Sequence, residues 1–150
     1  MTQEELDEAL LKAAQAGNVP WAEKLILQGA KVDAIGHVDA GWQPLHYAAY
    51  YGHKELVELL IAKDAKVDAG TVAGRRPLHF AAIRDCREAV KSLVEHGADP
   101  TALDDDGQTP RDNCGLDEEI RTFLQKAERE WRGWKRVRRI AALRPKGPSL

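Results

Sequence analysis

The chain of 150 residues lacks the features that stabilise a small protein covalently or hold it in a membrane. Its two cysteines, Cys86 and Cys114, cannot form the disulfide framework of a small secreted domain, so we expect a reducing compartment. No apolar run approaches the roughly 20 residues that a membrane span needs. The first eight residues are acidic, unlike a secretory signal peptide. We expect a cytoplasmic protein, with the nucleus as the alternative.

Patterns that would carry enzyme chemistry are also missing. Ser92 and Ser149 are the only serines, and neither lies in a Gly-x-Ser-x-Gly elbow. The five histidines and two cysteines show no metal-ligand spacing. The aspartates at 104–106 lack the spaced oxygens of a calcium loop, and no glycine-rich loop is placed to hold a phosphate. We therefore expect no catalytic site, no metal and no cofactor.

Charge is present but unevenly distributed along the chain, whose net charge is −2. Residues 131–150 contain seven basic side chains and no acidic one. Residues 1–130 hold 15 basic and all 24 acidic side chains, a net charge of −9. This division indicates an acidic body and a basic appendage with different tasks.

The most informative feature of the sequence is an internal repeat. The segment Pro44–Ala49 (PLHYAA) returns 33 residues later as Pro77–Ala82 (PLHFAA), and Thr109-Pro110 takes the same place in degraded form after another 33 residues. Proline in a first helical turn and the 3–4 spacing of Leu, Ile and Val that follows indicate two helices per unit. One such unit is too small to bury its own apolar face, so the units must stack.

These motifs, with the Gly-Ala turns that follow each second helix, resemble the ankyrin repeat over residues 5–126. The resemblance implies an all-α ankyrin-repeat solenoid, in which each repeat is a helix-turn-helix plus a β-hairpin finger, followed by a basic C-terminal helical extension. We place the ankyrin domain at 1–126, and the basic helix and tail at 127–150. The repeats fall at about 5–37, 38–71, 72–103 and 104–126. Thr2 and Glu5 fit a capping box for the opening helix.

Departures from the repeat pattern have structural consequences. Asp64 and Asp85 stand where the repeat has glycine, so both must adopt a positive φ. The segment between Asp33 and Pro44 is two residues longer than its equivalent in the next repeat, which predicts a longer first finger. The last repeat lacks the Leu-His and Ala-Ala pairs, and we expect its first helix to be stunted.

The resemblance also assigns roles to histidines and aromatic residues. It implies that His46 and His79 hydrogen-bond the backbone between repeats. The other histidines are expected at the surface: His37, His53 and His96. Three aromatic residues at apolar positions of the repeat are expected in the core: Trp21, Tyr47 and Phe80.

In this family a partner binds the finger tips and the exposed ends of the first helices, on the concave face. Here the second and third repeats carry Trp, Tyr and Arg, the residue types most enriched at binding hot spots. The candidate partner-binding residues are Asp39, Trp42, Tyr50, Tyr51, Arg75, Ile83 and Arg84. Neighbouring positions of the same surface are Gln15, Ala16, Ala40, Val72, Ala73, Asp105, Asp106 and Gln108. Alternatively, Trp42 packs over the longer first finger and one tyrosine fills a gap between repeats.

The basic tail allows four interpretations. Trp131 and Trp134 continue an apolar stripe at helical spacing, with a helix break expected at Gly133. The cations beside them are Arg132, Lys135, Arg136, Arg138 and Arg139. The tail caps the stack, enters a large acidic assembly such as a ribonucleoprotein, acts as a nuclear import signal, or binds as a basic amphipathic helix to an anionic membrane or a calmodulin-type groove.

The sequence therefore predicts a non-enzymatic protein–protein interaction module, an adaptor or scaffold that is monomeric by itself. The alternative function is a structural subunit of a large ribonucleoprotein or cytoskeletal assembly, anchored through the tail. Because the acidic body repels phosphate, contact with nucleic acid or another acidic partner would involve the tail alone.

Overall fold

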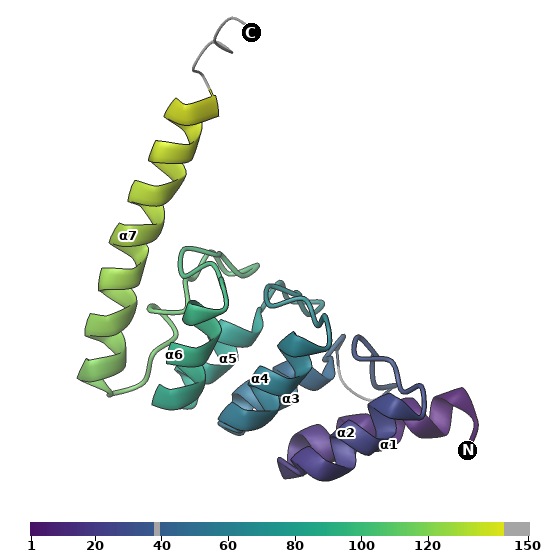
Figure 1. Cartoon of the computed structure of the whole chain (residues 1–150). Coiled ribbons are helices and arrows are strands. Elements are labelled where there is room, and N and C mark those ends of the chain that lie inside the picture. Colours follow the sequence, from purple (N-terminus) through teal and green to yellow (C-terminus); the bar gives the residue numbers. More distant parts are fainter. Residues whose placement is uncertain (38–39, 143–150) are drawn as a thin grey trace, which may run out of the picture.

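A computed structural model describes residues 1–37 and 40–142, and this part of the chain forms seven helices and no β-strand (Figure 1). The helices are α1 (Gln3–Ala16), α2 (Val19–Leu27), α3 (Pro44–Tyr50), α4 (Lys54–Ala62), α5 (Pro77–Ile83), α6 (Arg87–Glu95) and α7 (Glu118–Ala142). The all-α class is confirmed. The fingers between repeats are turns, so their hairpin form is not confirmed. None of the described helices is long and apolar enough to cross a membrane.

The helices form two layers. The first helices of the repeats, α1, α3 and α5, pack in succession, and the second helices α2, α4 and α6 form the outer layer beside them (Figure 1). Helix α7 packs against α6 as the last member of the outer layer and then continues past the stack (Figure 1). The inner layer ends at α5.

The repeat motif explains how each first helix begins. Proline occupies the first turn of α3 and of α5, where its missing N–H leaves no bond unmade. The opening helix begins instead at the predicted capping box, in which Thr2 and Glu5 bond each other's backbone N–H. That prediction is confirmed.

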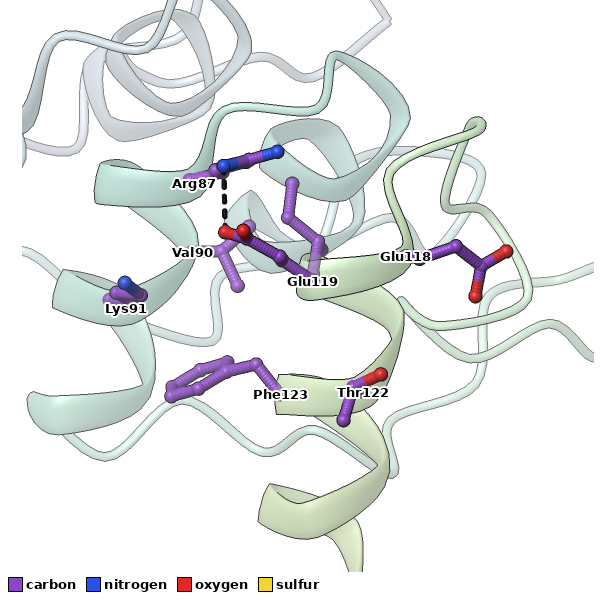
Figure 2. Close-up of a pocket in the computed structure, with 8 residues that line it drawn as sticks. Arg87, Val90, Lys91, Glu118, Glu119, Thr122 and Phe123 are labelled. Atoms are coloured by element: carbon purple, nitrogen blue, oxygen red, sulfur yellow. Dashed lines mark hydrogen bonds and ion pairs between the residues drawn. The ribbon is translucent and has the colours of Figure 1, made fainter.

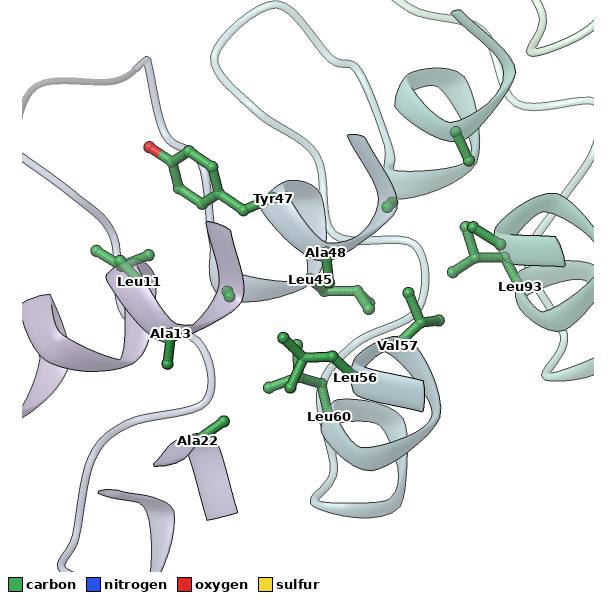
Figure 3. Packing of buried hydrophobic residues seen from close by; sticks show 14 of the residues in the cluster. Leu11, Ala13, Ala22, Leu45, Tyr47, Ala48, Leu56, Val57, Leu60 and Leu93 are labelled. Atoms are coloured by element: carbon green, nitrogen blue, oxygen red, sulfur yellow. The ribbon is translucent and has the colours of Figure 1, made fainter. Parts of the chain in front are cut away.

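Small and branched residues share the core between repeats (Figure 3). The alanine pairs at 48–49 and 81–82 have no exposed surface, which lets neighbouring helices approach closely. Leu56, Leu60 and Leu93 fill the space between the layers and are also fully buried. Burying one leucine side chain contributes about 1.5–3 kcal/mol, and no repeat can do so without its neighbour.

The two motif histidines join successive repeats, as the resemblance implied. His46 Nε2 lies 2.7 Å from the carbonyl oxygen of Ala69, and its Nδ1 accepts a 2.9 Å hydrogen bond from the backbone N–H of Gln43. Because Nδ1 accepts, Nε2 carries the ring proton and donates it. His79 bonds the Gln108 carbonyl in the same way. Burial lowers the pKa of His46 to about 4.

Most other residue predictions are confirmed, but Trp21 and His53 depart from expectation. Tyr47 and Phe80 are buried. Trp21 is 37% exposed, because it lies in the first turn of α2 on the solvent side of the outer layer. His53, expected at the surface, is only partly exposed, since its ring lies against Gly17 and its Nε2 is 3.0 Å from the Gln15 carbonyl oxygen. The remaining two, His37 and His96, are exposed.

Two of the departures from the repeat pattern have the expected effects, whereas the longer first finger includes residues 38–39, which lie outside the described residues. The φ angles of Asp64 and Asp85 are 70° and 52°. Between α6 and α7 the chain makes turns and no helix, with Asn113 N–H bonded to the Thr109 carbonyl at 3.2 Å. The prediction that the first helix of the last repeat is stunted is therefore confirmed.

Helix α7 runs without interruption through Gly133, so the predicted break there is wrong. The side chains on either side of the glycine stay in contact across it: the Trp131 and Trp134 rings lie 5.5 Å apart, and Lys135 Nζ lies 5.6 Å from the Trp131 ring. One exposed glycine costs a helix about 1 kcal/mol, which is too little to end a 25-residue helix held by good helix formers.

Candidate functional site

The fingers form a continuous row above the inner helices. The Val72 N–H bonds the Ala40 carbonyl of the preceding finger at 2.9 Å, and the Asp105 N–H bonds the Ala73 carbonyl at 3.0 Å. These bonds fix each finger to the next, so residues at equivalent positions form a line across the repeats. All four residues are exposed.

Trp42 lies at the centre of an aromatic cluster beneath the first finger. Its ring centroid is 4.2 Å from that of Phe80, 5.0 Å from Tyr47 and 5.4 Å from Tyr50. Because Phe80 belongs to the third repeat, Trp42 joins the second repeat to the third. The side chain is partly buried, which fits the packing interpretation that the sequence left open.

The exposed edge of this cluster consists of residues at the ends of α3 and α5. The rings of Tyr50 and Tyr51 meet edge to face at 5.0 Å, and the Arg84 guanidinium lies 4.9 Å over the Tyr50 ring. Tyr51 is 49% exposed, Arg84 is exposed, and Ile83 beside it is half-buried. Within the described residues, Arg84 makes no ion pair with a carboxylate.

Arg75 is held by the third finger and not by the aromatic cluster. Its Nε lies 3.6 Å from Asp104, and a terminal nitrogen lies 3.9 Å from Asp106. Burial acts to raise the pKa of the Asp104 carboxyl, but hydrogen bonds from the Gln108 backbone, the Asn113 amide and the Asp106 backbone hold it below its ordinary value. Asp104 is therefore ionised and forms an ion pair with Arg75. The remaining predicted residue, Asp39, lies outside the described residues.

A cavity of about 310 Å³ beside α1 extends the concave surface into the first repeat, and of its lining residues only Gln15 belongs to the partner surface predicted from the sequence. It lies between α1, the first finger and the ring of Tyr47. The lining residues are Glu4, Asp7, Glu8, Leu11, Lys12, Gln15, Ile35, Gly36, His37 and Tyr47. The i, i+3, i+4 spacing of the three acidic residues was the available signal for one exposed face of a helix.

A second cavity, of about 460 Å³, lies on the other layer between α6 and α7 (Figure 2). Its apolar lining comes from Val90, Ile120 and Phe123. One end is closed by Arg87, whose guanidinium bonds both Asp117 and Glu119 at 2.6 Å. The sequence does not predict this cavity, because it depends on how α7 packs against α6, which no local pattern encodes.

The cations of α7 from Arg132 onward divide into two groups. Lys135 and Arg138 are engaged: Lys135 Nζ lies 3.5 Å from Asp99, and Arg138 lies 4.4 Å over the ring of Trp134. The others are exposed and have no carboxylate partner within the described residues: Arg132, Arg136 and Arg139.

The described residues offer little reactive chemistry. No three His, Cys, Asp or Glu side chains among them are grouped to hold a metal ion. Burial raises the pKa of Cys114 to about 11 and raises that of Cys86, so both thiols are protonated and weakly nucleophilic at neutral pH.

Comparison with known proteins gives matches along the repeats. A family model described as ankyrin repeats (3 copies) matches residues 9–104. Oxysterol-binding protein-related protein 1 from Mus musculus is 37% identical over 72 residues, which cover 43% of this chain and 8% of that protein. Ankyrin repeat and SOCS box protein 3 from Homo sapiens is 37% identical over 101 residues, 65% of this chain and 19% of that protein. Ankyrin repeat and SOCS box protein 10 from Mus musculus is 59% identical over 71 residues, 47% of this chain and 15% of that protein. The chain thus spans less than a fifth of each relative.

Proposed function

This chain belongs to the ankyrin-repeat family, and from that membership we propose that it is a non-enzymatic adaptor or scaffold that holds a protein partner on the concave surface of its second and third repeats. Ankyrin repeats generally mediate protein–protein interaction. Two of the relatives combine such repeats with a SOCS box in their names, which fits an adaptor built from repeats and a further module.

The observation that carries the proposal is the exposed edge formed by Tyr50, Tyr51 and Arg84 below the row of fingers. Tyrosine buries a large area at low entropic cost, arginine adds charge and donors, and truncating either at the centre of an interface costs about 2 kcal/mol or more. The cluster behind them is packed across two repeats, so the edge is rigid before a partner arrives. A pre-organised edge loses less entropy on binding than a mobile one.

The experiment is co-purification from native lysate with the full chain and with a Tyr51→Ala/Arg84→Ala variant. Both side chains are exposed, so the variant should stay folded, whereas Trp42→Ala would open a cavity between repeats. The matched control is Trp21→Ala/Lys24→Ala, which removes an exposed aromatic residue and a cation from the outer helix α2. We expect the partner to be lost only with the first variant. A partner that stays bound to it would refute this site.

The second candidate function is a structural subunit anchored in a large acidic assembly through the basic tail. The observation in its favour is that α7 continues beyond the stack with Arg132, Arg136 and Arg139 exposed. Deletion of residues 131–150 should then release the chain from the assembly, and raised salt should do the same. Partners that remain on residues 1–130 at high salt would favour the adaptor function.

A further inference from the structure

We propose that the partner presents a short extended segment with a basic, an apolar and an acidic residue at least three residues apart, and that its basic side chain enters the cavity beside α1. This inference rests on the proposed function, because it extends the same concave surface into the first repeat. It specifies the chemistry of the partner.

The cavity has the two surfaces that a lysine or arginine side chain needs. Leu11, Ile35 and Tyr47 provide apolar wall, and Figure 3 shows Tyr47 extending toward Leu11. Carboxylates of α1 stand at the rim. A long basic side chain buries its methylene stem along apolar surface while its charged end reaches polar groups. A neutral apolar side chain would leave the carboxylates unmatched, and an acidic one would be repelled.

Two of the rim carboxylates are available for a partner. One oxygen of Asp7 already accepts hydrogen bonds of 2.8 Å from the Gln3 amide and the Lys31 backbone. Glu4 has no hydrogen bond or ion pair among the described residues. Glu8 has only an exposed pair with Lys12 at 3.5 Å, which contributes little in water.

The character of the surface then changes from one inner helix to the next. Helix α1 presents the carboxylates, the end of α3 presents Tyr50 and Tyr51, and the end of α5 presents Arg84, which has no carboxylate partner among the described residues. A segment lying across the three helices meets negative, aromatic and positive surface in that order. The complementary order is basic, apolar and acidic.

The spacing follows from the geometry of the two chains. Packed helices lie about 8–10 Å apart, and an extended chain advances about 3.3 Å per residue. One inner helix therefore corresponds to at least three residues of the segment. The first step is longer, because Glu4 and Glu8 lie near the start of α1 whereas Tyr51 and Arg84 lie at the ends of α3 and α5. The direction of the segment follows from its own sequence, because either chain direction can present the same order of charges.

The test uses a random 12-residue peptide library displayed on phage and selected on the full chain at low salt. We expect enrichment of peptides in which a basic residue lies at least six positions from an acidic residue, with an apolar residue between them. The most enriched peptide, synthesised with a fluorescent label, is then titrated by fluorescence polarisation. A version of the peptide in which Gln replaces both the basic and the acidic residue measures the contribution of charge to affinity.

Protein variants assign the contacts. Glu4→Gln/Glu8→Gln should weaken binding of the labelled peptide by about five- to ten-fold, since two exposed charge contacts are removed. The control Glu23→Gln/Glu55→Gln makes the same change of charge on the outer helices α2 and α4 and should leave affinity unchanged. Tyr51→Ala should also weaken binding, and circular dichroism checks that each variant is folded.

The outcomes separate this inference from the proposed function. Peptides that lose affinity with Tyr51→Ala but carry no basic residue and ignore the Glu4/Glu8 variant would overturn the inference and leave the concave binding surface standing. A selection whose peptides are insensitive to both sets of variants would overturn both. Equal weakening by the outer-layer control would show that only net charge matters, which also overturns the inference.

Discussion

Among single residues, the two imidazoles that join the repeats have the largest measurable consequence for stability. His46 has a folded-state pKa of about 4, well below its unfolded value of 6.5, because burial disfavours the charged ring. The unfolded state therefore binds the proton more readily, so the stabilisation is complete above pH 6.5 and is lost as pH falls toward 4. Burial also lowers the pKa of His79, which acts in the same direction.

We expect the free energy of unfolding to fall by about 3 kcal/mol between pH 7 and pH 4 from His46 alone, measured by urea titration at several pH values. The Asp68 carboxyl, whose pKa burial raises, partly offsets this loss near pH 4. His46→Gln should cost about 2 kcal/mol at pH 7, since it disturbs two buried hydrogen bonds, and should flatten the pH dependence. The exposed control His37→Gln should not flatten it. If the free energy of unfolding of His46→Gln depends on pH as steeply as that of the unmodified chain, groups other than His46 cause the acid sensitivity.

Backbone conformation provides a second residue-scale prediction. Asp64 has a φ of 70° and an exposed side chain, so Asp64→Gly should raise stability by about 0.5–1 kcal/mol by removing strain. Gly17 has a φ of 67°, and a Cβ there would lie 2.5 Å from the His53 ring. Gly17→Ala should therefore cost about 2–4 kcal/mol. Thermal unfolding of both variants checks the signs, and a destabilised Asp64→Gly would contradict the strain argument.

How far the sequence determined these residue roles depends on whether the cause was local. The positive φ of Asp64 and Asp85 followed from a repeat register that fixes the backbone at that position. The exposure of Trp21 and the packing of Trp42 against Phe80 depend on how neighbouring repeats are rotated against each other. That rotation is a tertiary property, and no spacing within one repeat contains it.

At the scale of elements, α7 differs most from expectation. It is one helix of 25 residues, although its sequence contains Gly133 and its C-terminal part lies beyond the stack. Gly133→Ala should stabilise this part by about 1 kcal/mol, since alanine has the higher helix propensity. Amide hydrogen exchange of residues 131–142 should slow by about five-fold. Gly133→Pro is the opposite variant and should accelerate exchange there. No change with alanine would indicate that the segment is not helical in solution.

The elements themselves were largely predictable, and the spaces between them were not. Short motifs predict both the helices that begin with proline and the absence of a first helix in the last repeat. The cavity beside α1 requires Tyr47 of the next repeat to form its wall, and the cavity beside α6 requires the packing of α7 against α6. A single sequence contains no record of such pairings across repeats, so it does not assign the acidic face of α1 to the concave surface.

For the whole molecule, the stack behaves as a one-dimensional array in which each repeat is stabilised by its neighbours. Its last outer-layer contacts come from the first half of α7: Ile120, Leu124 and Ala127 are buried, and Arg111 bonds the buried Glu128 at 3.0 Å. The second half adds an exposed ion pair between Lys135 and Asp99 and a partly buried Trp131. The two halves should therefore contribute very unequally to stability.

Truncation tests this division and, with it, the interpretation of the tail as a cap. A chain of residues 1–130 should lose only about 1–2 kcal/mol of its free energy of unfolding in urea, because it lacks only the partly buried Trp131 and the Lys135–Asp99 ion pair. A chain of residues 1–117 exposes the outer face of α6 and should lose about 4 kcal/mol or more, given the buried side chains removed. If the 1–130 chain instead loses as much stability as the 1–117 chain, the basic segment serves as a cap of the stack, and its cations only interact with solvent. If only the 1–117 chain loses stability, the exposed arginines at 132, 136 and 139 are not needed for the fold and can serve a separate anchoring function. Salt-dependent release of the full chain from its assembly would then measure that function.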